Sequence, residues 1–194
     1  MTTDKTYQAQ PKCDAAHSQL MVVDIQQKLG DAMPGKVLNR VLQNTVLLLR
    51  SARLLEVPVI HAEQYPEGLG PTHTVVAEAL PKTVRSFRKT TFSCMATPSL
   101  CEAVLSAQPP RQVILVGMEA HICILQTALD LAAAGCTVFV VEDAICSRRL
   151  ENYQNALERL RDQRISVVSA ESVVFEWLGD AKHPHFKAIQ TLLR

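Results

Sequence analysis

Residues 112–118 read QVILVGM and carry the strongest β-strand signal in the chain. An unbroken apolar run of this length is typical of a strand that is buried on both faces of a parallel sheet. Residues 120–134 follow at once with helical spacing, and Gly135 closes that helix. A strand that leads directly into a helix is the repeating unit of parallel sheets. The stretch therefore predicts an α/β fold.

The same alternation of strand and helix extends outward from this stretch in both directions. Further strands are predicted over residues 19–25, 58–63, 83–88, 136–141 and 165–168, and further helices over 36–56, 98–107 and 150–162. Right-handed crossovers would then cover both faces of the sheet. We predict a three-layer α/β/α sandwich, Rossmann-like, around a six-stranded and mostly parallel sheet. In such sheets, functional residues gather beyond the C-terminal ends of the strands.

Length and charge limit the classes of function. The 194 residues fit a polar tail over 1–18 and a single domain over 19–194, because two domains would each have a thin core. The 20 Lys and Arg residues against 19 Asp and Glu leave a net charge of +1. So small a charge favours neither nucleic acid nor a membrane surface as a partner.

Membrane and redox signals are also weak. No apolar stretch reaches the ~20 residues that a membrane span requires, and the first residues lack the apolar core of a signal peptide. The six cysteines form no Cys-x-x-Cys pair, so free thiols are expected rather than a disulfide framework. We therefore expect an intracellular, cytoplasmic protein.

Three reactive side chains stand at equivalent positions near the ends of predicted strands. Asp24 ends the first strand, Lys89 follows the third, and Cys123 lies just past residues 112–118. A cysteine nucleophile must become a thiolate, which a neighbouring base, a cation or a helix N-terminus favours. Asp24, Lys89 and the first turn of the following helix supply these three conditions. Each residue also has a structural interpretation, because such aspartates often cap loops and cysteines are often buried.

Three motifs around these residues resemble the isochorismatase-like cysteine hydrolase superfamily. They are Val22-Val23-Asp24-Ile25-Gln26, Lys89-Thr90-Thr91-Phe92-Ser93 and Gly117-Met118-Glu119-Ala120-His121-Ile122-Cys123-Ile124. The resemblance runs from about residue 19 to residue 168. The loop over 63–70 and the segment over 179–184 narrow the resemblance to a smaller group within the superfamily. The sequence is similar to the isochorismatase domain-containing proteins of eukaryotes, and the resemblance implies the same three-layer fold.

The resemblance also implies a catalytic triad. Asp24 would be the base, Lys89 would hold the charges in place, and Cys123 would be the nucleophile. Isochorismatases proper carry a residue other than cysteine at the nucleophile position. Because Cys123 is retained here, the resemblance favours an amide or related acyl substrate over a vinyl ether.

A non-proline cis peptide bond precedes the cysteine in members of this superfamily. In this chain it would join Met118 to Glu119. The resemblance then implies that the N–H groups of Ala120 or Glu119 and of Cys123 turn toward an oxyanion.

The sequence predicts neither a metal nor a cofactor. Nicotinamidases of the superfamily bind a metal through an Asp-x-His motif after the second strand and a further His, whereas this chain has Glu63-Gln64-Tyr65 there. His73 alone, or His183 with His185, supplies too few ligands. Gly68-x-Gly70 lacks the third glycine and the helix of a dinucleotide-binding fingerprint.

Five further side chains near the strand ends are candidates for contact with a small-molecule substrate: Gln26, Gln64, Tyr65, Phe92 and His121. Aromatic side chains beside a strand end are also often part of the core, and His121 fits a solvent-facing position at the helix start equally well. Cys94, five residues after Lys89, is interpreted as structural or as a second thiol near the pocket.

The leading hypothesis is a cofactor-independent cysteine hydrolase that passes through a thioester. The alternative is a binding or regulatory protein that retains the scaffold without turnover. The resemblance also implies a homo-oligomer, a dimer or a tetramer. The apolar residues within 171–193 would supply an interface, or would instead pack within the subunit.

Overall fold

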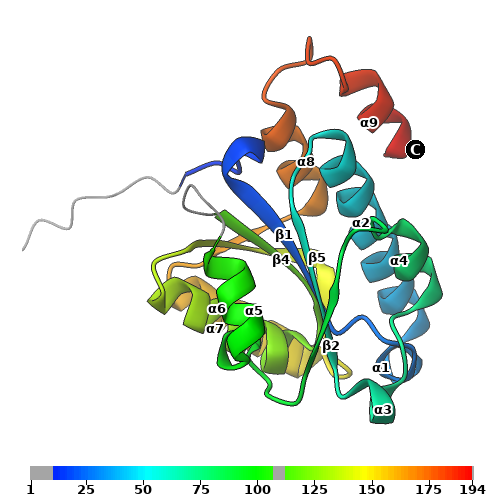
Figure 1. The fold of residues 1–194 in the computed structure, drawn as a ribbon, viewed down its shortest axis with the longest axis vertical. Coiled ribbons are helices and arrows are strands. Elements are labelled where there is room, and N and C mark those ends of the chain that lie inside the picture. Colours follow the sequence, from blue (N-terminus) through cyan, green and yellow to red (C-terminus); the bar gives the residue numbers. More distant parts are fainter. Residues whose placement is uncertain (1–10, 107–111, 194) are drawn as a thin grey trace, which may run out of the picture.

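Six strands form one sheet in the computed structural model, which describes residues 11–106 and 112–193. Helices cover both faces of this sheet (Figure 1). The strand order is β3-β2-β1-β4-β5-β6, and every neighbouring pair is parallel. The strands are β1 (Ser18–Val23), β2 (Val59–Gln64), β3 (Ser86–Lys89), β4 (Gln112–Met118), β5 (Thr137–Cys146) and β6 (Ser166–Val168). The predicted three-layer fold with a six-stranded parallel sheet is confirmed.

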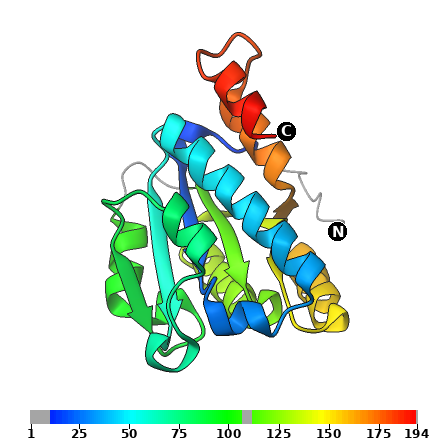
Figure 2. The same ribbon diagram turned by 90° about the vertical axis from the view of Figure 1, so that its right-hand side faces the viewer.

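The helices divide between the two faces of the sheet (Figure 1). One face carries α2 (Gly35–Leu54), α4 (Thr74–Ala79), α8 (Ala170–Leu178) and α9 (Phe186–Leu192); the other carries α5 (Pro98–Leu105), α6 (Leu125–Ala133) and α7 (Leu150–Asp162). Two short helices, α1 (Gln27–Asp31) and α3 (Pro66–Leu69), follow the C-terminal ends of β1 and β2. Figure 2 shows α9 at the end of the molecule opposite these two helices.

The position of β4 between two cores explains why its sequence is apolar without interruption. Ile114, Val116 and Met118 pack into the core beneath α2 and α8. Val113 and Leu115 pack into the second core beneath α5, α6 and α7. Because side chains alternate between the faces of a strand, a strand covered on both faces needs apolar residues at every position.

Several element boundaries differ from the predicted ones. The strand predicted from residue 83 begins at Ser86, because a turn in which the Val84 N–H donates to the Pro81 carbonyl (2.9 Å) precedes it. β5 continues past the polar pair Glu142 and Asp143, because partners elsewhere satisfy them; the Asp143 carboxylate, for example, accepts the Ala170 N–H at 2.8 Å. The tail residues 1–10 and the predicted helix end at 107 lie outside the described residues.

The C-terminal segment over residues 171–193 forms α8 and α9, which the sequence analysis did not assign. Its apolar residues Val173, Val174, Trp177, Leu178 and Ile189 are buried against the same core as α2. Most of its apolar surface therefore packs within the subunit, which was one of the two interpretations. Phe175 remains 42% exposed.

Gly117 brings the ends of β1 and β4 into close contact. It pairs with Val23 in the parallel register and has φ +135°, a conformation that residues with a side chain rarely adopt. A Cβ atom at this position would lie 1.9 Å from the Val23 carbonyl oxygen. Only glycine fits there, beside the end of β1 that leads into Asp24.

The close contact predicts that Gly117→Ala is far more damaging than Gly135→Ala. Gly135 also has positive φ (+84°), but no atom lies within 4 Å of its added Cβ. We expect Gly135→Ala to cost about 1–2 kcal/mol from backbone strain alone, and Gly117→Ala to cost more than ~4 kcal/mol or to give no folded protein. Urea unfolding followed by circular dichroism measures both. Equal unfolding midpoints would show that the contact at Gly117 carries no special constraint.

Candidate functional site

The site lies where the C-terminal ends of β3, β1 and β4 meet one edge of the sheet (Figure 1). Asp24 directly follows β1, Lys89 is the last residue of β3, and Cys123 lies five residues past the end of β4. The sequence predicted that these three residues share one edge. The structure places Asp24 and Lys89 in direct contact, and the charges of both act on Cys123.

Asp24 is a buried carboxylate whose two oxygens have different surroundings. Its side chain is 0% exposed, and its Oδ2 accepts a hydrogen bond from Lys89 Nζ at 2.7 Å. Within the described residues, no N–H or O–H group donates to Oδ1. Burial raises the pKa of Asp24, against the opposing effects of Lys89, of the Cys123 thiol and of the Gln64 backbone N–H. Oδ1 is therefore a buried carboxylate oxygen without a hydrogen-bond partner.

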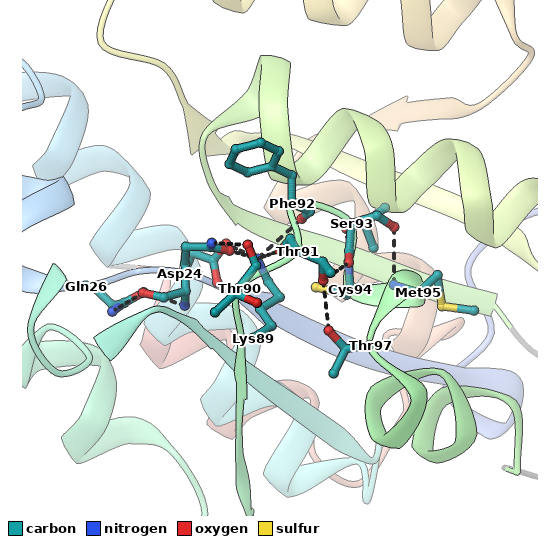
Figure 3. A network of polar contacts seen from close by, with 12 residues as sticks. Asp24, Gln26, Lys89, Thr90, Thr91, Phe92, Ser93, Cys94, Met95 and Thr97 are labelled. Carbon is teal, nitrogen blue, oxygen red and sulfur yellow. Dashed lines mark hydrogen bonds and ion pairs between the residues drawn. The ribbon is translucent and has the colours of Figure 1, made fainter. Parts of the chain in front are cut away.

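The Lys89 ammonium is equally buried and fully engaged by protein acceptors (Figure 3). Nζ donates to Asp24 Oδ2 at 2.7 Å and to Gln64 Oε1 at 2.6 Å, and it lies 3.3 Å from the carbonyls of Thr91 and Phe92. Burial alone would lower the pKa of Lys89, but the Asp24 carboxylate outweighs burial, so the pKa is raised. Lys89 therefore remains a cation at neutral pH.

Cys123 lies on a short π-helix, Ala120–Ile124, which leads into α6. The first π-type bond runs from the Ile124 N–H to the Glu119 carbonyl at 3.2 Å. Ala120 stands first in the helix, so its N–H has no acceptor within the helix. The peptide bond between Met118 and Glu119 is cis, at the position that the resemblance implies. The helix predicted over 120–134 thus starts with a wider turn, and such turns occur often at functional sites.

The surroundings of the Cys123 thiol favour its protonated form. Its side chain is 6% exposed, and burial first, then the nearby Asp24 carboxylate, raises its pKa to about 12, against the opposing charge of Lys89. The sequence alone predicts surroundings that favour a thiolate. The structure instead pairs a thiol with a carboxylate, so the proton must leave as the thiol reacts.

Cys94 is a second buried thiol beside the same charges. Its N–H donates to Thr127 Oγ1 at 3.0 Å, one helical turn after Cys123. Burial raises its pKa to about 12, and the charges of Lys89 and Asp24 also act on it. Of the two interpretations of Cys94, the structure supports a second buried thiol close to Asp24 and Lys89.

Glu119 and His121 are fixed by the loop that follows β5. The Glu119 carboxylate is 5% exposed and accepts the N–H and the Nε of Arg148 at 3.1 and 2.9 Å. His121 Nδ1 bonds Ser147 Oγ at 2.9 Å, and its Nε2 lies 3.3 Å from the Asn152 amide. Both ring nitrogens of His121 therefore already have protein partners. No feature of the sequence pointed to the partners Arg148 and Ser147.

Gln26 and Gln64 form a continuous amide network that ends at Lys89. The Gln26 side chain accepts the Gln64 N–H at 2.8 Å and donates to the carbonyls of Gln64 and Gly70 at 3.0 and 2.6 Å. The Gln64 side chain accepts from Lys89 and donates to the Thr90 carbonyl at 2.8 Å. Contact of these two side chains with a substrate remains a prediction.

Tyr65 and Phe92 are both 54% exposed rather than part of the core. Tyr65 has a left-handed backbone (φ 34°) and lines an open cavity of about 310 Å³ next to the end of β3. The Phe92 ring points away from the Asp24–Lys89 contact in Figure 3. Either ring can therefore meet a ligand only from the surface of the site.

The described residues contain no group of three or more His, Cys, Asp or Glu side chains arranged to hold a metal ion. Within the same residues, no helix is both long and apolar enough to cross a membrane.

Comparison with known proteins identifies a family and a fold. The profile of the isochorismatase domain matches residues 18–172. Isochorismatase domain-containing protein 2 of Danio rerio is 40% identical over 176 residues, 91% of this chain and 86% of that protein. Isochorismatase domain-containing protein 1 of Danio rerio is 43% identical over 147 residues, 76% of this chain and 51% of that protein. The match to protein 1 thus spans about half of its length.

Two solved structures share the fold. The structure described as MAR1 ribonuclease from Caenorhabditis elegans has a TM-score of 0.87 and 34% identity, covering 94% of this chain and 92% of that chain. The YcaC gene product of Escherichia coli has a TM-score of 0.85 and 19% identity, covering 94% and 89%. It is described as an octameric hydrolase of unknown specificity.

The electrostatics predict opposite effects of two charge-removing variants on Cys123. In Asp24→Asn, the thiol loses the carboxylate that raises its pKa and keeps the ammonium that lowers it. We expect iodoacetamide to label Cys123 at least about 3-fold faster than in the parent near pH 8, because only the thiolate reacts. In Lys89→Met we expect slower labelling. Peptide mass spectrometry measures the rates, and circular dichroism checks folding; slower labelling in Asp24→Asn would contradict the charge arrangement.

Proposed function

The chain belongs to the isochorismatase domain family, and from that premise we propose that it is a cofactor-independent cysteine hydrolase acting on a small amide or related acyl compound. One observation carries the proposal. Asp24 is a buried carboxylate with one oxygen bound to Lys89 and the other free of N–H and O–H donors, and it interacts with the Cys123 thiol. A base beside a nucleophile, held in turn by a third group, is the arrangement of nucleophilic catalysis.

In the first half of the proposed reaction, Asp24 Oδ1 takes the thiol proton while the Cys123 sulfur attacks the substrate carbonyl. The negative charge moves to the carbonyl oxygen, where the N–H groups of Ala120 and Cys123 would stabilise it. The same proton then passes from Asp24 to the departing amine. The amine leaves and a thioester remains on Cys123.

In the second half, water replaces the amine. Asp24 takes a proton from the water as its oxygen attacks the thioester carbon. The carbon–sulfur bond breaks, the acid product leaves, and the proton returns to Cys123. Lys89 stays charged throughout and holds Asp24 in place. The raised pKa of Asp24 makes it a stronger base than an exposed aspartate, closer to the range in which general bases work at neutral pH.

Two other functions are separable from this one by experiment. The Caenorhabditis elegans structural relative is described as a ribonuclease, so RNA belongs among the substrates to be assayed, although a net charge of +1 does not favour a polyanion. A binding protein that retains the scaffold would bind a small molecule and form no covalent intermediate. The homo-oligomer, a dimer or a tetramer, also stays a proposal, which light scattering after size-exclusion chromatography measures.

We predict that an activated ester acylates Cys123. With p-nitrophenyl acetate, intact-protein mass spectrometry should show one acetyl group, and peptide mapping should place it on Cys123. In a panel of small amides, Cys123→Ala should lower kcat/KM by at least about 1,000-fold. The matched variant Cys101→Ala, which removes a partly exposed thiol on α5, should leave it unchanged.

Two results would contradict the proposed hydrolase. One is acylation that is unchanged in Cys123→Ala, because the covalent intermediate would then form elsewhere. The other is cleavage of RNA that persists in Cys123→Ala, because that activity would not use the proposed nucleophile.

A further inference from the structure

Lys89 has three ammonium protons, and the protein accounts for all of them. Asp24 Oδ2 and Gln64 Oε1 accept two at 2.7 and 2.6 Å, and the third is shared by the carbonyls of Thr91 and Phe92, each at 3.3 Å. The Gln64 amide oxygen thus lies as close to Nζ as the Asp24 carboxylate does. With no donor left over, Lys89 binds only one oxygen of Asp24.

Gln64 is itself held rigidly. Its backbone N–H and carbonyl are both bonded to the Gln26 side chain, at 2.8 and 3.0 Å, and its Nε2 donates to the Thr90 carbonyl at 2.8 Å. Gln26 is 0% exposed. Because Nε2 is occupied by a carbonyl, the amide must present its oxygen to Lys89. The network from Gln26 through Gln64 therefore fixes the direction in which the ammonium points.

We propose that Gln64 is a positioning residue for the triad: it holds the Lys89 ammonium away from Asp24 Oδ1 and so keeps that oxygen free for the Cys123 proton. This inference rests on the proposed function. Without the Gln64 oxygen, the freed N–H of Lys89 has one unpartnered buried acceptor close by, which is Asp24 Oδ1. A lysine that binds both oxygens would stabilise the carboxylate and block its access to the thiol.

Among the described residues, three charged or titratable groups surround Asp24, and a variant that tests Gln64 must leave all three in place. They are Lys89 from β3, Cys94 from the 3₁₀-helix Cys94–Ala96, and Cys123 from the π-helix. Gln64 adds no charge to this group. Replacing it with Met or with Glu removes the donor to the Thr90 carbonyl in both cases, so the two variants differ from each other in the oxygen acceptor and its charge.

Two variants of Gln64 should shift the pH dependence of Cys123 labelling in opposite directions. Gln64→Met removes the oxygen that accepts from Lys89, so the proposal has Lys89 turn to Asp24 Oδ1. That oxygen is then blocked from the Cys123 thiol, and the labelling midpoint moves to lower pH. Gln64→Glu keeps an oxygen acceptor but adds a negative charge, which disfavours further negative charge nearby and moves the midpoint to higher pH. The exposed helix-end residue Gln163 supplies matched controls: Gln163→Met and Gln163→Glu should leave the midpoint unchanged.

Turnover gives a second readout on any amide that the parent hydrolyses. Gln64→Met should lower kcat at least about 10-fold with little change in KM, because the base is blocked while the substrate pocket is intact. A rise in KM with kcat unchanged would assign Gln64 to substrate binding and overturn the proposal. Labelling midpoints that do not separate, or that shift in the same direction, would also overturn it. Labelling of Cys123 requires no turnover. A parent protein that hydrolyses no amide would therefore count against the proposed hydrolase, whereas the labelling midpoints would still decide the proposal for Gln64.

Discussion

The buried ion pair between Asp24 and Lys89 is the interaction on which the rest of the site depends. Both side chains are 0% exposed, and two charges withdrawn from water cost several kcal/mol each unless their hydrogen bonds are made. Lys89 meets that condition completely. Asp24 meets it only in part, because Oδ1 has no N–H or O–H donor. An incompletely bonded buried carboxylate is unfavourable for stability alone, and it is what a base beside a thiol requires.

The sheet supplies the geometry for this pair. Asp24 and Lys89 come from strands β1 and β3, with β2 between them, and Gln64 at the end of β2 bridges the gap. On the other side of β1, Gly117 allows β4 to approach the Val23 carbonyl closely. The chain then turns into the π-helix that carries Cys123. The two charges and the proposed nucleophile are thus placed by the ends of neighbouring strands rather than by long loops.

Much of the fold could be predicted from the sequence, because apolar runs and helical spacing report directly on burial. The residues around Asp24, Lys89 and Cys123 also stood at recognisable strand ends. Local patterns did not reveal contacts between distant segments. Examples are the bond between Arg148 and Glu119 and the two hydrogen bonds between the Gln26 side chain and the Gln64 backbone. Local patterns also do not show that burial and the Asp24 carboxylate raise the pKa of Cys123 against the opposing charge of Lys89.

The central claim is that the Asp24 carboxylate interacts with the Cys123 thiol, and a pH titration of the Asp24 carboxyl carbon by ¹³C NMR tests it most directly. The structure predicts a midpoint above that of an exposed aspartate, because burial raises the pKa of Asp24. It also predicts a further rise in Cys123→Ala, because the thiol contact lowers that pKa. An Asp24 midpoint that is the same in the parent and in Cys123→Ala would contradict the claim.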